Sequence, residues 1–138
     1  MFGKTRSMML ITGIAVCLAV MAAPVFAIYA HLSTTLTGNA INGVVPTGRA
    51  SVDQSKLPRH PATVDVQISS VNLPDGTVLG VVLTDCSPSP VGTITLKGGA
   101  GQLQTKLPAG CQIGRTSSIF VNNGSTTVLS GGAPWTVG

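Results

Sequence analysis

Short stretches that alternate between apolar and polar residues run through most of the chain. In the clearest of them, residues 63–69, Val64, Val66 and Ile68 fall on one face and polar side chains on the other. This alternation is typical of a half-buried antiparallel strand. Residues 78–83 are apolar on both faces, which predicts a strand near the centre of a sheet.

Six further stretches have the length of a strand and are separated by turn residues. They cover residues 32–37, 48–52, 91–96, 101–107, 118–121 and 126–129. Asn123 and Gly124 stand between the last two, and an Asn-Gly step between apolar runs is a strong hairpin signal. The pattern predicts an all-β fold, an immunoglobulin-like β-sandwich of seven or eight antiparallel strands, with a small β-barrel as the alternative.

The first residues follow a different pattern. Lys4 and Arg6 precede an uncharged run over residues 8–23, and Val25 and Ala27 provide short side chains before a cut after Ala27. These features are typical of a helical secretory signal peptide. We therefore expect a signal peptide over 1–27 and one secreted domain over 28–138. The alternative is an uncleaved membrane anchor.

The composition supports export and excludes some partners. The chain is 43% hydrophobic and only 9% charged, and it contains no glutamate. From residue 28 onward six basic and four acidic residues remain, a net charge of +2, beside 25 serines and threonines. This charge is too weak and too scattered to mark a nucleic-acid surface. We expect a secreted, periplasmic or cell-surface protein whose contact with the membrane is only the transient one of its leader.

Two cysteines, Cys86 and Cys111, remain after the leader. In a chain sent to an oxidising compartment, such a pair predicts a disulfide. The rival interpretation is a metal or redox pair, but neither cysteine has a histidine close by in the sequence.

Candidate catalytic and metal-binding residues are few. His31 and His60 stand apart from other ligand residues, and the Gly98–Gly101 stretch is a turn without the lysine of a phosphate loop. Asp75 and Asp85 could approach each other across a hairpin and form a weak Ca²⁺ site, although turn-forming aspartates are the plainer interpretation. No Gly-x-Ser-x-Gly elbow is present, so we expect no enzyme and no cofactor.

Trp135 is the one residue for which the sequence suggests a recognition role. An exposed tryptophan at the edge of a sandwich can stack on a sugar or contact a partner chain. The other interpretation is that Trp135 packs over the open end of the sandwich and fixes the C-terminus.

Several turn and strand motifs resemble those of a largely uncharacterised family of small secreted bacterial β-sandwich proteins. The motifs are LTG from Leu36, INGVVPTGRA from Ile41, VNLPDGT from Val71, VGTITL from Val91 and TVLSG from Thr127. The resemblance implies a β fold and export, and carries no catalytic motif. The cysteine pair and the Gly132–Trp135 tail depart from the family pattern.

These observations predict a non-enzymatic secreted or cell-surface β-sandwich with a structural or protein-interaction role. The alternative is an extracellular ligand-binding module for a carbohydrate or Ca²⁺. The expected partner is an extracellular protein or a glycan, and not a nucleic acid.

Overall fold

The computed structural model describes residues 29–55, 61–86, 89–108 and 111–138, and all regular structure in them is β. The predicted signal peptide, with its cleavage site after Ala27, lies outside the described residues, as does His60. Within the described ranges, no helix has the length and apolar character needed to cross a membrane.

Nine strands follow one another along the described chain. They are β1 (Tyr29–Thr37), β2 (Thr47–Ser55), β3 (Thr63–Ser69), β4 (Val78–Leu83), β5 (Gly92–Thr95), β6 (Gly101–Lys106), β7 (Ser118–Asn123), β8 (Thr126–Gly132) and β9 (Thr136–Val137). All of them pair antiparallel in one sheet of order β5-β4-β7-β8-β1-β2-β3-β6, with β9 beside β1. The all-β prediction is therefore confirmed, with nine strands in place of seven or eight.

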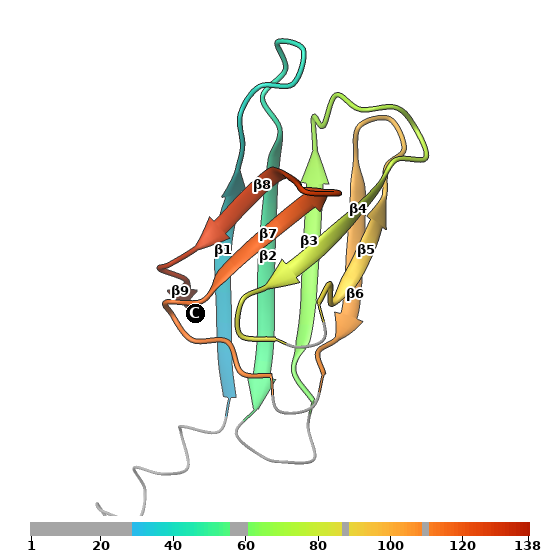
Figure 1. Ribbon diagram of the computed structural model, residues 1–138. Helices are drawn as coiled ribbons and strands as arrows, with labels where there is room; N and C mark the ends of the chain where they lie inside the picture. The colour runs from blue at the N-terminus through green and yellow to red at the C-terminus, as the bar shows by residue number, and fades with distance from the viewer. Residues whose placement is uncertain (1–28, 56–60, 87–88, 109–110) are drawn as a thin grey trace, which may run out of the picture.

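The sheet is folded over into two layers (Figure 1). Strands β1, β2, β3 and β6 form one layer, and β4, β5, β7 and β8 cross them in the other. At one seam Thr37 of β1 pairs with Ser130 of β8. At the other, a two-residue turn closed by Lys97 and Ala100 connects β5 to β6. The sheet is thus nearly closed into a barrel, so the sandwich and the small barrel are two descriptions of the same arrangement.

Apolar side chains from both layers fill the space between them. The alternation read from the sequence is confirmed in β3, where Val64, Val66 and Ile68 are buried. The remaining strand residues of the core are Leu32, Leu36, Ala50, Val52, Leu79, Val81, Leu83, Ile94, Ile119, Val121, Val128 and Leu129. Valine, leucine and isoleucine therefore supply most of this core, whose burial drives folding.

Strand β9 is absent from the sequence-based expectation. Its Thr136 and Val137 pair with Ser33 and Leu32 of β1. Two residues are too few to show a period of two, so this strand depends on the tertiary fold and not on a local pattern. Strands β1 and β2 are also longer than expected, with nine residues each, and β2 includes Asp53.

The connections between strands lie at the two ends of the sandwich. The β1–β2, β3–β4, β5–β6 and β7–β8 connections share one end, here called the hairpin end, from which the β1–β2 loop projects (Figure 1). The β4–β5 and β6–β7 connections and the C-terminal segment lie at the other end, here called the clamp end. Loops at one end of a rigid sandwich are common positions for binding residues.

Gly38 follows β1 where the chain passes close to β8. A Cβ atom at this position would overlap the carbonyl oxygen of Val128, a backbone atom that cannot rotate away. We expect Gly38→Ala to lower the free energy of unfolding by about 3 kcal/mol, as overpacking does.

Urea unfolding followed by circular dichroism measures this cost. Gly43→Ala is the matched control, because its Cβ would meet nothing within 4 Å, although φ is +81°. The left-handed conformation alone predicts a cost of about 1 kcal/mol there. A Gly38→Ala variant no less stable than Gly43→Ala would contradict the close approach of the two strands.

Candidate functional site

The outer surface of the layer formed by β1, β2, β3 and β6 is polar across its whole width. Successive side chains of a strand point to opposite faces, so the neighbours of the buried residues point outward. We call this surface the polar face; its residues are His31, Ser33, Arg49, Ser51, Asp53, Asp65, Gln67, Gln102, Gln104 and Lys106. The register places His31 opposite Asp53, and Ser51 between Ser33 and Asp65.

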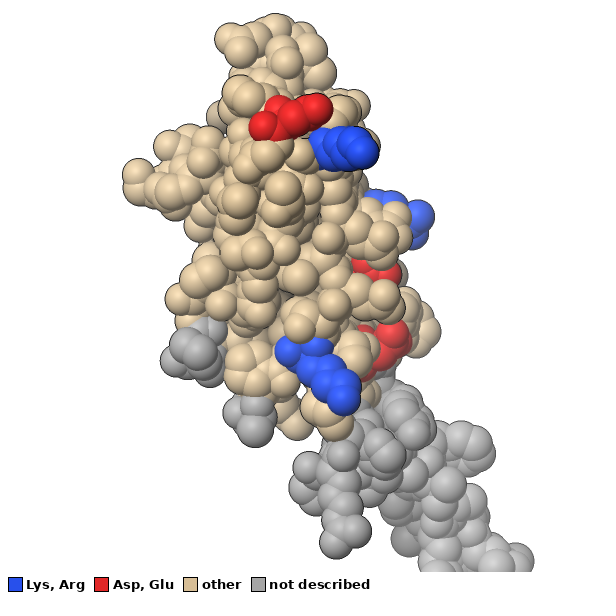
Figure 2. Space-filling view, turned by 90° about the vertical axis from the view of Figure 1, so that its right-hand side faces the viewer, with Lys and Arg blue, Asp and Glu red and all other residues tan. Residues whose placement is uncertain are grey.

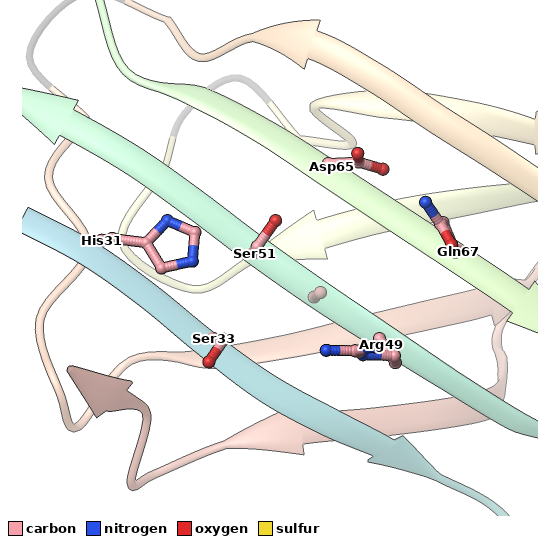
Figure 3. A pocket seen from close by; sticks show the side chains of 7 residues that line it. His31, Ser33, Arg49, Ser51, Asp65 and Gln67 are labelled. Carbon is pink, nitrogen blue, oxygen red and sulfur yellow. The ribbon is translucent and has the colours of Figure 1, made fainter. Parts of the chain in front are cut away.

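A shallow hollow of about 290 Å³ lies on the polar face, and its rim comes from three strands. We call it the polar hollow; its lining residues are His31, Ser33, Arg49, Ala50, Ser51, Asp65 and Gln67. In Figure 3, Ser33 and His31 come from β1, Arg49 and Ser51 from β2, and Asp65 and Gln67 from β3. The hollow therefore combines a guanidinium, an imidazole, an amide, a carboxylate and two hydroxyls.

His31 is held by Asp53 on the neighbouring strand. The two residues are directly paired in the β1–β2 register, and His31 Nδ1 lies 2.5 Å from Asp53 Oδ1. Their side chains are 48% and 67% exposed. Since Nδ1 is engaged by the carboxylate, the ring is oriented and Nε2 is the nitrogen available to a ligand.

Asp65 and Gln102 are linked on the other side of the hollow. Gln102 Nε2 donates a hydrogen bond of 3.1 Å to Asp65 Oδ1. This bond fixes the Asp65 carboxylate and leaves lone pairs of its second oxygen as acceptors. Gln67, the next outward residue on β3, lies opposite Arg49 of β2.

Arg49 occupies the middle of the face. It is exposed, and it extends from β2 toward β1 on the side of Ser33 (Figure 3). In the described part of the chain, the one ion pair joins His31 and Asp53, so no carboxylate there lies within 4.0 Å of the Arg49 guanidinium. Its donors face the hollow and the solvent.

The two cysteines form a disulfide at the clamp end. Cys86 and Cys111 are bonded, with their Cα atoms 4.9 Å apart, and both side chains are buried. The bond ties the β4–β5 connection to the β6–β7 connection. This pairing agrees with the prediction from the sequence.

The structure does not bring Asp75 and Asp85 together, as the weak shared Ca²⁺ site would require, and the plainer interpretation of turn and surface aspartates fits their positions. Asp75 precedes β4 and accepts a hydrogen bond of 2.8 Å from the Gly98 amide, whereas Asp85 follows β4 and accepts one from the Ser117 hydroxyl. The six residues of β4 separate them by about 20 Å of extended chain. Among the described residues, no group of three or more histidine, cysteine or acidic side chains is placed to hold a metal ion.

Of the two interpretations of Trp135 from the sequence, the exposed ligand or partner contact is contradicted, and packing over the end of the sandwich is confirmed. Its side chain is only 1% exposed, and its Nε1 donates a hydrogen bond of 2.8 Å to the carbonyl oxygen of Ser117. Its backbone amide donates to the Arg115 carbonyl oxygen. Trp135 packs over the clamp end and holds the C-terminal segment, as the second interpretation from the sequence predicted.

Ser117 connects these features and was missed by the sequence analysis. It is 2% exposed, and it binds the Asp85 carboxylate through its hydroxyl and the Trp135 indole through its carbonyl. The Gly114 amide also donates to the Ser117 hydroxyl. Residues singled out by the sequence for chemistry thus form a structural clamp around one buried serine.

A second hollow, of about 330 Å³, lies at the hairpin end between the β1–β2, β3–β4 and β5–β6 connections. Val44, Leu73 and Asp75 are among the residues that line it. Beside it, the β1–β2 loop exposes Val44 and Val45, which are 39% and 58% exposed. Val78 at the start of β4 is 54% exposed.

Charged groups are sparse on the surface. Figure 2 shows a few lysine, arginine and aspartate side chains on the side that it presents, where uncharged residues cover most of the surface and one acidic and one basic side chain lie next to each other near the top.

Comparisons of the chain with protein-family models, with curated proteins and with solved structures gave no match.

Proposed function

We propose that this chain is a non-enzymatic, exported β-sandwich that binds an extracellular ligand on its polar face. The observation that carries the proposal is the polar hollow, where planar hydrogen-bonding groups from three paired strands converge on one open site. The favoured ligand class is a carbohydrate, because each hydroxyl group of a sugar can both donate and accept hydrogen bonds. The amide, carboxylate, imidazole and guanidinium groups of the hollow provide partners for both roles.

The hollow suits binding better than catalysis. Its lining residue His31 and the Asp53 side chain that holds it are about half or more exposed. Electrostatic stabilisation of a transition state needs a site from which water is excluded, where fixed dipoles act strongly. Hydrogen bonds to a polar ligand do not need such a site, since wet interfaces bind well.

Export is part of the proposal. Its support is the signal-peptide pattern before Ala27 and the Cys86–Cys111 bond, which an oxidising compartment preserves. The disulfide and the buried clamp around Ser117 would keep the domain folded outside the cell.

A blocking substitution tests the proposed site. On a glycan array we expect the protein, purified after export, to bind a defined set of saccharides. Ser51→Tyr fills the hollow with a side chain that strands tolerate well, so it should weaken that binding at least tenfold.

Thr93→Tyr is the matched control, because Thr93 is an exposed residue of β5 in the other layer. Its binding should equal that of the unchanged chain. Absence of saccharide binding, or an equal loss in both variants, would contradict the proposed site. Turnover of a bound saccharide would contradict the non-enzymatic assignment.

A second candidate function is a structural or protein-interaction role at the hairpin end. The observation that favours it is the exposed apolar side chains of Val44, Val45 and Val78 near the second hollow. Replacing Val45 with serine separates the two functions, because it alters the hairpin end and leaves the polar face unchanged.

A further inference from the structure

Arg49 gives the polar hollow a charge preference that its other groups do not. Its guanidinium has no carboxylate partner among the described residues and extends toward Ser33, while His31 and Asp53 satisfy each other. An arginine with free donors binds a carboxylate through two parallel hydrogen bonds, which is a strong and directional contact.

The β3 side of the hollow has the opposite character. Asp65 accepts from Gln102 and retains acceptor capacity, and Gln67 provides both an amide donor and a carbonyl acceptor. A ligand that meets both sides must therefore carry an anionic group toward Arg49 and hydroxyl donors toward Asp65.

We propose that the polar hollow binds a saccharide that carries a carboxylate, of the uronic-acid type. Arg49 binds the carboxylate, and Asp65 and Gln67 bind ring hydroxyls. This inference rests on the proposed function and deepens it, because it names the class of saccharide. The volume of about 290 Å³ lies at the small end of the range for ligand sites, so the hollow takes one sugar unit.

An acidic peptide fits the hollow less well. The carboxylate of such a peptide would satisfy Arg49, but the lining contains Ala50 as its one apolar side chain, so it offers no pocket for apolar side chains. A free phosphate would engage Arg49, but it carries no ring hydroxyls for the free acceptor oxygen of Asp65, and the negative charge of Asp65 would oppose it.

Isothermal titration calorimetry with matched ligands tests the inference. The probes are tri-galacturonate, the neutral galactotriose, a short polyglutamate and inorganic phosphate, each titrated into the protein purified after export. We expect tri-galacturonate to bind at least tenfold more tightly than galactotriose, and both to bind more tightly than polyglutamate or phosphate.

Substitutions assign the preference to individual groups. Arg49→Gln should remove the preference for tri-galacturonate while galactotriose binding is retained. Asp65→Asn should weaken galactotriose, because ring hydroxyls lose a carboxylate acceptor. Lys97→Gln, which removes one positive charge in the β5–β6 turn outside the polar face, should leave the preference unchanged.

The outcomes separate the inference from the proposed function. Equal affinity for the two saccharides, lost in Ser51→Tyr, would overturn the inference while the proposed function stands. Equal losses in Arg49→Gln and Lys97→Gln, or tighter binding of polyglutamate or phosphate, would overturn it as well. Failure of every saccharide to bind would overturn both.

Discussion

Replacing Trp135 with alanine is expected to lower the free energy of unfolding by about 3–5 kcal/mol, the usual cost of removing a buried large aromatic side chain. Trp135 is 1% exposed and is the largest of the fully buried side chains. Its loss leaves a cavity at the clamp end and frees the segment that carries β9. Urea unfolding followed by circular dichroism measures the effect.

The conservative variant isolates the hydrogen bond. Trp135→Phe keeps most of the apolar volume but leaves the Ser117 carbonyl oxygen without its indole donor, which costs about 1–3 kcal/mol for a buried acceptor. Because Trp135 is the one tryptophan of the chain, the fluorescence of the folded protein reports on it alone. Blue-shifted emission that resists acrylamide is expected; emission typical of a solvated indole would contradict the buried position.

Replacing both Cys86 and Cys111 with alanine is expected to destabilise the domain by about 3.5 kcal/mol. The bond joins residues 25 positions apart, and closing a loop of this length restricts the unfolded chain by that amount in the chain-entropy model. The Tm of the double variant in a thermal scan checks the expectation.

Reduction provides the control for this prediction. Dithiothreitol should lower the Tm of the unchanged chain to that of the double variant, and should leave the double variant unaffected. An unchanged Tm in the double variant would show that the disulfide is unimportant for stability. If dithiothreitol still lowered the Tm of the double variant, that decrease would arise from a part of the protein other than this disulfide.

The alternation of apolar and polar residues predicted most of the fold. The ranges expected for β3 and β4 coincide with the observed strands, and the Asn-Gly step lies in the β7–β8 hairpin. Both signals are local, because a half-buried strand and a tight turn each restrict the residues within them. The strand expected over residues 78–83 lies between Asp75 and Asp85, so the idea that these two aspartates approach each other across a hairpin was inconsistent with it.

Features that depend on contacts between distant parts of the chain were harder to predict from the sequence. The burial of Trp135 requires the β6–β7 connection, which supplies the Ser117 acceptor 18 residues earlier in the chain. Strand β9 forms only because β1 offers a free edge at Leu32 and Ser33. A pattern within two residues cannot indicate which distant residues they pair with.

The polar hollow could be predicted only in part from the sequence. The outward positions of β1 and β2 follow from alternation around Leu32 and Val52, so a signal for the face was present. The pairing of His31 with Asp53 depends on the register of β1 and β2. The sequence does not determine this register, because the long connection between the two strands is compatible with several registers. The expected end of β2 at residue 52 excluded Asp53 and hid the pair.

Nuclear magnetic resonance mapping tests the central claim most directly. The amide resonances of the protein, purified after export, are followed while tri-galacturonate is added. The account predicts that the largest shifts cluster at the lining residues of the polar hollow, around Arg49, Ser51 and Asp65. Shifts confined to the hairpin end around Val44 and Val78, or no saturable shifts at all, would contradict it.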